Sequence, residues 1–294
     1  MNHRKVAVIG STGQLGTDLV DVLSESEHFD VVPLRHEDAD CTDSDAVRKA
    51  LFRTRPQIVV NCAASVRVDD CEDRADEAFQ VNAIGALNIA KACAELDALC
   101  IYISSDYVFD GTKATPYVES DPANPINVYG TSKLAGEYLV RQAAPRWLIV
   151  RMASLFGKAG ARGKGGNFIE TILAKARKGE PLQVVNDIRI SPIYARDAAE
   201  ALVKVIEADG VLHLTNGGAC TWYEFAQQAL DLAGLRVSID PVSSNGYPAR
   251  ARRPANSVLE STRFLVKLRS WQDALAAYMG EQGHMTLGQV GQLA

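Results

Sequence analysis

The 294-residue sequence lacks the features of several protein classes. No apolar run reaches the roughly 18 residues expected of a membrane-spanning helix. The formal net charge of −5 provides no basic surface for nucleic acid. The six cysteines form no C-x-x-C pair and no zinc-like pattern with histidine, so we expect free thiols and no metal site. The apolar run before Gly10 is too short for a signal peptide, and we expect a cytoplasmic protein.

The sequence does contain a regular alternation of two patterns. Short apolar runs predict buried strands at residues 6–9, 29–34, 58–61, 100–104, 147–151 and 211–214. Helical spacing of apolar residues follows the first strand and recurs at 45–53, 75–96, 129–142, 167–178, 197–207, 222–232 and 271–279. This alternation predicts an α/β protein with a Rossmann-type, doubly wound parallel sheet covered on both faces.

The alternation stops after about residue 155. A basic segment with glycines at 157, 160, 163, 165 and 166 predicts a mobile loop, and residues 241–254 are expected to be irregular. We therefore expect two parts with the ligand between them. A dinucleotide-binding domain is formed by residues 1–154 plus about 193–215. A smaller C-terminal substrate-binding lobe is formed by about 155–192 plus 216–294.

A glycine-rich turn joins the first strand to the first helix. Gly10, Gly13 and Gly16 allow a tight turn and let the backbone approach a pyrophosphate, which the helix N-terminus attracts. The strand–turn–helix context favours a dinucleotide cofactor over a turn made for packing. We assign to the same cofactor the other residues of this turn and those that follow the third strand: Thr12, Gln14, Leu15, Cys62, Ala63 and Ala64.

The end of the second strand bears on the choice of cofactor. An acidic residue there would bind the ribose 2′-hydroxyl of NAD, but the sequence has Arg35, whose guanidinium suits the 2′-phosphate of NADP. NADPH is therefore the preferred cofactor, with NADH as the alternative. Asp40, beside Cys41, is a candidate partner of the adenine amino group, although an aspartate here also suits a helix cap.

Tyr129 and Lys133 are spaced to share one face at the start of a helix. A nearby ammonium favours the phenolate, so we expect Lys133 to lower the pKa of Tyr129 and make it a proton donor near neutral pH. Ser105 ends the fourth strand, at the sheet edge where α/β proteins bind ligands. These three residues predict polarisation of a carbonyl group, with hydride supplied by a nicotinamide.

Together these elements resemble the extended short-chain dehydrogenase/reductase superfamily. Residues 103–111 resemble the I-S-T-D-Y-V-F-D-G segment of dTDP-4-dehydrorhamnose reductases, and further matching segments extend the resemblance over residues 5 to about 279. The resemblance implies NADPH-dependent reduction of the 4-keto group of a nucleoside-diphosphate 4-keto-6-deoxyhexose in deoxysugar and cell-surface polysaccharide biosynthesis. It implies Ser105, Tyr129 and Lys133 as the catalytic set and places Asn82 beside the cofactor. It also implies these substrate contacts: Val66, Ser105, Asp106, Tyr107, Ser154, Asn167 and Arg253.

Three segments depart from the family pattern. Ser154 stands where the family commonly has a large aromatic residue, Val66 and Arg67 replace the usual residues after the third strand, and Arg189 with Ile190 replaces an aromatic–glycine pair. We expect these changes to fall in the sugar pocket and to leave the redox chemistry intact.

Two alternatives stay open. One is a non-catalytic NADP-binding regulatory subunit that resembles the β subunit of methionine adenosyltransferase, where a residue like Arg67 occurs. The other is a nucleotide-sugar dehydratase, although Tyr107 occupies the position of the glutamate that such enzymes use. We expect a nucleotide-sugar substrate as the partner and neither nucleic acid nor membrane, and we allow for a homodimer.

Overall fold

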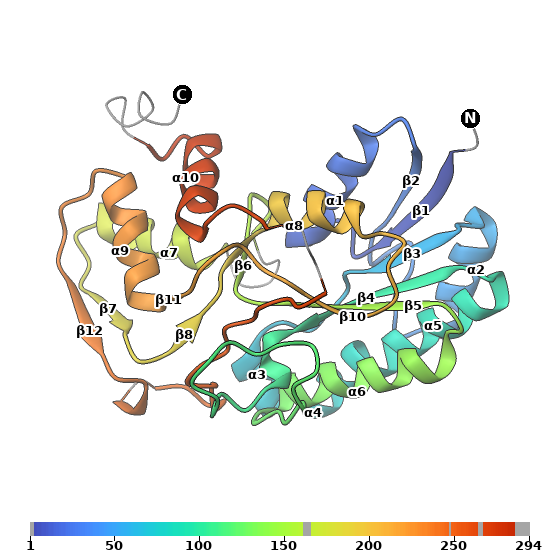
Figure 1. Ribbon diagram of the computed structural model, residues 1–294, viewed down its shortest axis with the longest axis horizontal. Helices are drawn as coiled ribbons and strands as arrows, with labels where there is room; N and C mark the ends of the chain where they lie inside the picture. The colour runs from blue at the N-terminus through green and yellow to red at the C-terminus, as the bar shows by residue number, and fades with distance from the viewer. Residues whose placement is uncertain (1–2, 161–165, 247, 264–266, 286–294) are drawn as a thin grey trace.

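The computed structural model describes residues 3–160, 166–246, 248–263 and 267–285. Its larger part is built on a six-stranded parallel sheet with the strand order β10-β5-β4-β3-β1-β2 (Figure 1). The strands are β1 (Arg4–Ile9), β2 (Phe29–Leu34), β3 (Ile58–Asn61), β4 (Leu99–Ser105), β5 (Trp147–Met152) and β10 (Gly210–Leu214). Each lies where the apolar runs predict a strand, and the doubly wound parallel sheet is confirmed.

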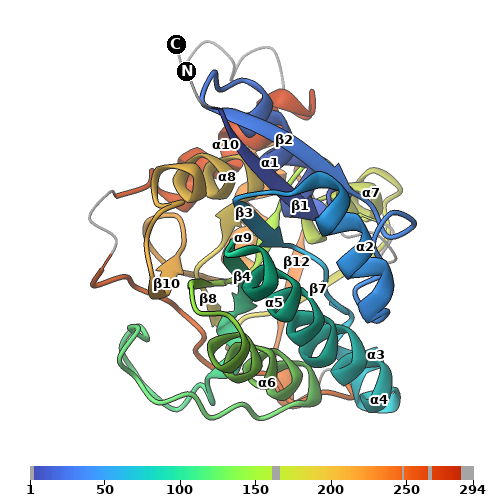
Figure 2. The ribbon, with the colours of Figure 1, turned by 90° about the vertical axis from the view of Figure 1, so that its right-hand side faces the viewer.

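Helices cover both faces of this sheet (Figures 1 and 2). On one face, α1 (Gln14–Ser24) and α8 (Ala195–Lys204) bury their apolar sides in a common core with the sheet. On the other, α2 (Ser44–Thr54), α5 (Gly85–Leu96) and α6 (Val128–Ala143) do the same. Ile9 at the end of β1 pairs with Leu34 of β2 and with Asn61 of β3, so the strands end together. Their carboxyl ends therefore share one edge, and ligands bind there in open α/β sheets.

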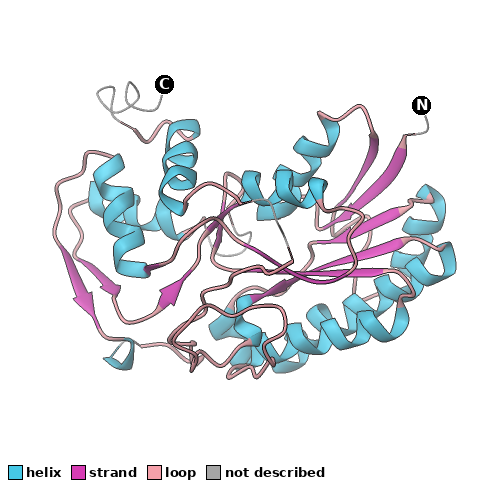
Figure 3. Ribbon diagram, in the orientation of Figure 1, coloured by secondary structure: helices cyan, strands magenta, loops and turns pink. Residues whose placement is uncertain are grey.

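A second hydrophobic core lies beyond that edge (Figures 1 and 3). It is formed by α7 (Phe168–Arg177), α9 (Trp222–Leu232) and α10 (Trp271–Glu281), together with short strand pairs. These pairs are β6 (Leu155–Phe156) with β9 (Ile193–Tyr194), β7 (Leu182–Val185) with β12 (Ile239–Val242), and β8 (Arg189–Ile190) with β11 (Cys220–Thr221). The assignment of this part to the substrate and of the sheet to the cofactor stays a proposal.

Several predicted elements are wrong in detail. Residues 241–254 are not irregular throughout, because β12 includes Pro241 and Val242 and pairs with β7. The predicted helix over 75–96 is three segments: α4 (Ala75–Phe79), a π-helical turn η1 (Gln80–Ile84) and α5. Tyr102 donates a hydrogen bond of 2.8 Å to the carbonyl oxygen of Asn82 within that turn, a long-range contact that the helical pattern could not reveal.

Other differences are smaller. The structure adds α3 (Val68–Asp73) and the 3-10 turns η2 (Asp106–Val108) and η3 (Ser244–Gly246), which the sequence did not predict. Of the glycine-rich segment, residues 161–165 lie outside the described residues, so the predicted mobile loop is not described. Among the helices that the structure describes, none is both long and apolar enough to cross a membrane.

Candidate active site

A cavity of about 750 Å³ lies between the carboxyl edge of the sheet and the second core. This volume is typical of small-molecule sites. Many predicted site residues line the cavity: Gly13, Gln14, Leu15, Cys62, Ala64, Val66, Ser105, Asp106, Tyr107, Tyr129, Lys133, Ser154, Asn167 and Arg253. Other predicted residues lie behind or beside it: Gly10, Thr12, Gly16, Arg35, Asp40, Cys41, Ala63 and Asn82.

The glycine turn has the geometry that a pyrophosphate requires. Gly10 has φ +75°, and a Cβ there would lie 2.9 Å from the backbone nitrogen of Ala63. A Cβ on Gly16 would collide with the carbonyl oxygen of Gly10. Gly13 caps α1 without a side-chain hydrogen bond, and Gly13, Gln14 and Leu15 line the cavity, so the positive end of the helix dipole lies beside it. The residues present therefore fit a dinucleotide.

Arg35 directly follows β2 and stands beside this turn. The carbonyl oxygen of Leu34 accepts from the backbone nitrogens of Gly10 and Ser11, at 3.0 and 3.2 Å. The Arg35 side chain is 62% exposed and lies 3.6 Å from Glu37 in an ion pair that solvent screens. Its charge is thus available to an anionic group near the glycine turn.

Asp40 and Cys41 lie further from the cavity. Asp40 accepts from the backbone and hydroxyl groups of Thr42, at 2.9 and 2.8 Å, and the cap of α2 is Asp43 instead. The helix-cap interpretation of Asp40 is therefore wrong. Cys41 is buried against Gly85, where an added Cβ would lie 2.8 Å from the thiol sulfur.

Two asparagines that were predicted to bind ligands form side-chain hydrogen bonds within the protein. Asn82 is fully buried, accepts from the backbone of Ser65 at 2.8 Å, and donates to Ser65 and to Ser132. It braces the loop after β3 and does not line the cavity, so its predicted contact with the cofactor is not supported by its position. Asn167 lines the cavity, but its side chain caps α7 and donates to Gly157 and Tyr278.

The catalytic candidates converge as the sequence predicts. Asn127 caps α6 by accepting from the backbone of Gly130 at 2.7 Å, which places Tyr129 and Lys133 on the first two turns facing β4. The Lys133 ammonium donates to the carbonyl oxygen of Ile103 at 2.7 Å and lies 4.1 Å from the Tyr102 ring centroid. Burial lowers the pKa of Lys133 to about 7, although the negative charge of Glu137 opposes this shift.

The predicted effect of Lys133 on Tyr129 is wrong for this structure. Burial raises the pKa of Tyr129, and a hydrogen bond with Ser105 offsets only part of that increase. Lys133 instead directs its ammonium at the backbone of β4. Ser105 donates to the carboxyl group of Asp106 at 2.9 Å and accepts from the backbone of Tyr107 at 3.1 Å. The three side chains still line one cavity, with Tyr107 in edge contact with Tyr129.

The comparisons with known proteins agree with this geometry. Residues 4–283 match the family model described as the RmlD substrate binding domain. The chain belongs to this family. It is 37% identical over 282 residues to the spore coat polysaccharide biosynthesis protein SpsK of Bacillus subtilis, covering 95% of this chain and 98% of the relative. It is 36% identical over 290 residues to dTDP-4-dehydrorhamnose reductase of Mycolicibacterium smegmatis, covering 94% and 86%.

A solved structure supports the same family membership. The dTDP-4-dehydrorhamnose reductase of Bacillus anthracis in complex with NADP superposes with a TM-score of 0.90 at 34% identity, covering 95% of this chain and 100% of that one. The predicted membership of the dTDP-4-dehydrorhamnose reductase family and the Rossmann-type fold are therefore confirmed.

The departures of this chain from the RmlD family pattern lie in two places. Val66, Arg67 and Ser154 line the cavity, and Ser154 adopts the left-handed backbone with φ +44°. Arg189 and Ile190 do not line it, so their predicted place in the sugar pocket is wrong. They form β8, where Arg189 is exposed and Ile190 packs in the second core.

Arg253 reaches the cavity from the segment before α10, as the family resemblance implies. Its guanidinium donates to both oxygens of Asp69, at 3.1 and 2.8 Å. This hydrogen bond is the main reason why the pKa of Asp69 falls to about 2. The pair joins α3 to the wall of the cavity opposite the glycine turn.

The sequence analysis missed an aromatic wall on the second core. Phe168 and Trp222 make an edge contact with ring centroids 4.7 Å apart, and both line the cavity with Phe225. Thr221 and Glu224 form a capping box that starts α9 at Trp222. The sequence from Thr221 to Glu224 contained this signal, because a capping box fixes which residues occupy the first turn.

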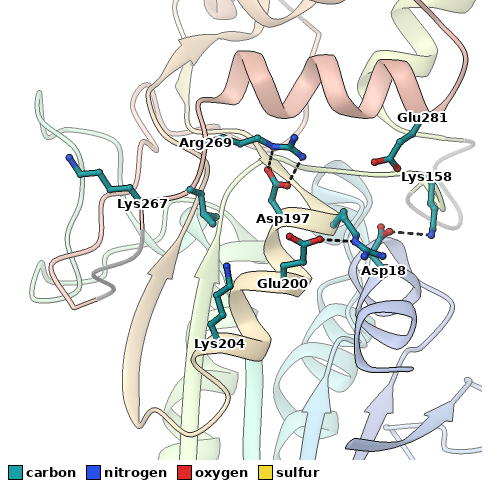
Figure 4. A pocket seen from close by; sticks show the side chains of 10 residues that line it. Asp18, Lys158, Asp197, Glu200, Lys204, Lys267, Arg269 and Glu281 are labelled. Carbon is teal, nitrogen blue, oxygen red and sulfur yellow. Dashed lines mark hydrogen bonds and ion pairs between the residues drawn. The ribbon is translucent and has the colours of Figure 1, made fainter. Parts of the chain in front are cut away.

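A second cavity of about 690 Å³ lies where α1, α8 and α10 meet (Figure 4). Its charged side chains largely neutralise one another. Arg269 donates to both oxygens of Asp197 at 2.8 and 2.6 Å, and Lys158 lies 3.4 Å from the buried Asp18. Among the described residues no group of three or more His, Cys, Asp or Glu is arranged to hold a metal ion.

Proposed function

We propose that this protein is an NADPH-dependent reductase of the 4-keto group of a nucleoside-diphosphate 4-keto-6-deoxyhexose, acting in deoxysugar and cell-surface polysaccharide biosynthesis. The observation that carries the proposal is that Ser105, Tyr129 and Lys133 line one cavity together with the glycine turn. The printed names of relatives support the substrate class: the M. smegmatis relative is a dTDP-4-dehydrorhamnose reductase, and SpsK serves spore coat polysaccharide biosynthesis.

The cofactor would be held by the residues around the glycine turn. The N-terminus of α1 would bind the pyrophosphate and Arg35 the 2′-phosphate, and Cys62 and Ala64 line the same cavity as Lys133. The NADP complex of the B. anthracis relative supports NADP over NAD. When bound, the reduced nicotinamide supplies a hydride to the carbonyl carbon.

The protein's own residues supply the proton and orient the carbonyl group of the substrate. Tyr129 gives its phenolic proton to the carbonyl oxygen, and Ser105 can donate a second hydrogen bond to the same oxygen. Lys133 keeps a cation beneath the site, anchored on Ile103. Because the pKa of Tyr129 is raised by its loss of hydration, the phenol holds its proton until the substrate oxygen becomes basic during reduction.

The substrate would extend from these groups toward the second core. Val66, Ser154, Asp106 and Tyr107, which line the cavity, would surround the sugar, and the aromatic wall and Arg253 would face the remainder of the nucleotide. Aromatic rings stack on a base, and a guanidinium pairs with a phosphate. We propose that these two features receive the base and the diphosphate.

The proposal is tested by incubating the protein with NADPH and a panel of nucleoside-diphosphate 4-keto-6-deoxysugars and following NADPH oxidation. The expected result is turnover with at least one substrate, lost in Tyr129→Phe. If NADPH binds tightly and no ketosugar is reduced, the protein is a regulatory subunit instead. A cytoplasmic location and a homodimer belong to the same proposal, and fractionation of cells and analytical ultracentrifugation test them.

A further inference from the structure

Asp106 has an unusual position for a carboxyl group. It begins η2 directly after Ser105, is 3% exposed and lines the cavity. Its Oδ1 accepts from the Ser105 hydroxyl at 2.9 Å. Its Oδ2 is buried without a hydrogen bond to any described residue. A buried carboxylate oxygen without a partner carries a high cost, and protonation removes much of it.

The groups that face Asp106 carry little opposing charge. Burial disfavours the ionised form, and it outweighs the effects of Ser257, from the segment after Arg253, and of Ser105, which favour that form. The pKa of Asp106 therefore rises to about 6. The charged neighbours have other partners, since Arg253 bonds to Asp69 and Lys133 donates to Ile103. Tyr129 on α6 also faces the carboxylate, whose charge raises the pKa of that phenol.

The protonation state of this carboxyl group decides which hydrogen bonds Ser105 can make. A serine hydroxyl donates one hydrogen bond and accepts two. With Asp106 ionised, Ser105 gives its proton to Asp106 and accepts from the backbone of Tyr107. The Ser105 proton then stays within the protein and is not directed at a substrate carbonyl.

Protonation of Asp106 reverses this arrangement. The carboxyl O–H can donate to Ser105, which then holds two incoming bonds, from Asp106 and from the backbone of Tyr107. The Ser105 proton is then released toward the cavity, which Tyr129 also lines. Ser105 and Tyr129 can then donate to the same substrate oxygen.

We propose that Asp106 is a positioning residue for carbonyl reduction, which sets the direction in which Ser105 donates its hydrogen bond. This inference rests on the proposed function, since it concerns the same site. It assigns to Asp106 an action through Ser105, beyond a contact with the sugar. No bond is formed or broken at Asp106 beyond the gain or loss of its own proton.

The test has one arm that needs neither cofactor nor substrate. Infrared difference spectroscopy of the apo protein should show the band of a protonated carboxylic acid that is lost as the pH rises through about 6 and is absent in Asp106→Asn. In Ser105→Ala the transition should move to higher pH, because the carboxylate loses a hydrogen bond. Asp110→Asn, on the same segment, removes a carboxylate that bonds Thr112, Tyr117 and Asn124 and should leave the band intact.

The second arm measures kcat/KM for ketosugar reduction against pH. The kcat/KM of the wild type should fall about tenfold for each pH unit above the pKa of Asp106. The fall should become steeper once Lys133 also loses its proton. Asp106→Asn and Ser105→Ala should both lack the Asp106 inflection and keep that of Lys133. In kcat at saturating substrate, the double variant should be no more impaired than Ser105→Ala alone, because Asp106 acts on the reduction step through Ser105, whereas its contact with the sugar affects KM.

Three results would overturn the proposal. One is an infrared band that does not respond to Ser105→Ala. Another is an Asp106 inflection that persists in Ser105→Ala, and the third is additive losses in the double variant. If no ketosugar is reduced at all, the proposed function fails, while the infrared arm still decides whether Asp106 and Ser105 are coupled.

Discussion

The buried carboxylate of Glu137 accepts two hydrogen bonds from the guanidinium of Arg151, at 2.9 Å from Nε and 2.7 Å from Nη2. This pair ties α6, which carries Tyr129 and Lys133, to β5 in the centre of the sheet. Ser104 adds a third bond to Glu137 at 2.6 Å. The position of the catalytic helix therefore depends on a charge pair that solvent hardly reaches.

We expect Glu137→Gln and Arg151→Met each to lower the free energy of unfolding by about 3–5 kcal/mol, because each leaves a buried partner uncompensated. The double variant Glu137→Gln/Arg151→Met should be less destabilised than the sum of the two single variants. Urea unfolding measures the effect. The exposed pair Arg48–Glu95 is the control, and its removal should cost less than about 1 kcal/mol. Equal losses from both pairs would contradict the argument.

Arg35 should decide cofactor preference. Its side chain is exposed beside the glycine turn, so Arg35→Ala removes a charge-assisted bond to the 2′-phosphate worth about 1.5–3 kcal/mol. Affinity for NADPH should fall by about 10- to 100-fold, while affinity for NADH stays the same. Fluorescence titration of both cofactors measures this. Equal affinities for the two in wild type, unchanged by the substitution, would exclude the role.

Substitutions in the catalytic set should follow an order. Tyr129→Phe removes the proton donor and keeps the ring, so turnover should fall by about 10²–10⁴-fold with little change in cofactor affinity. Ser105→Ala should cost about 10–100-fold, because one neutral hydrogen bond is lost and Tyr129 remains. Lys133→Met should reduce both turnover and cofactor binding. Steady-state kinetics with a reducible ketosugar measure the order, and near-full activity of Tyr129→Phe would refute the assignment.

Lys133 should make stability depend on pH. Burial lowers its pKa to about 7, whereas in the unfolded chain it titrates near its ordinary value of 10.5. Between these values the unfolded state binds more protons than the folded state, so the contribution of Lys133 to stability rises with pH from about 7 toward 10. In Lys133→Met this rise should be absent. Guanidinium unfolding over that pH range measures it, and identical slopes for the two proteins would contradict a buried, neutralisable lysine.

The sequence by itself determined the elements whose signals are local. Continuous apolar runs located all six strands of the parallel sheet, because strands covered on both faces need no alternation. Gly10, Gly13 and Gly16 identified the turn at the first helix, since backbone approach demands glycine there. The i, i+4 spacing of Tyr129 and Lys133 placed both on one helical face, and the family resemblance supplied the chemistry.

Only the tertiary structure decided how these groups are oriented. Lys133 donates to Ile103 and Asn82 turns to Ser65 and Ser132, partners that lie far from them along the chain. The burial of Asp106, with one oxygen unpaired, arises from packing between β4 and segments more than a hundred residues later. Such burial raises a carboxyl pKa because low-polarity surroundings disfavour charge. A linear pattern records which side chains are present, whereas hydrogen-bond direction and desolvation depend on the neighbours that folding supplies.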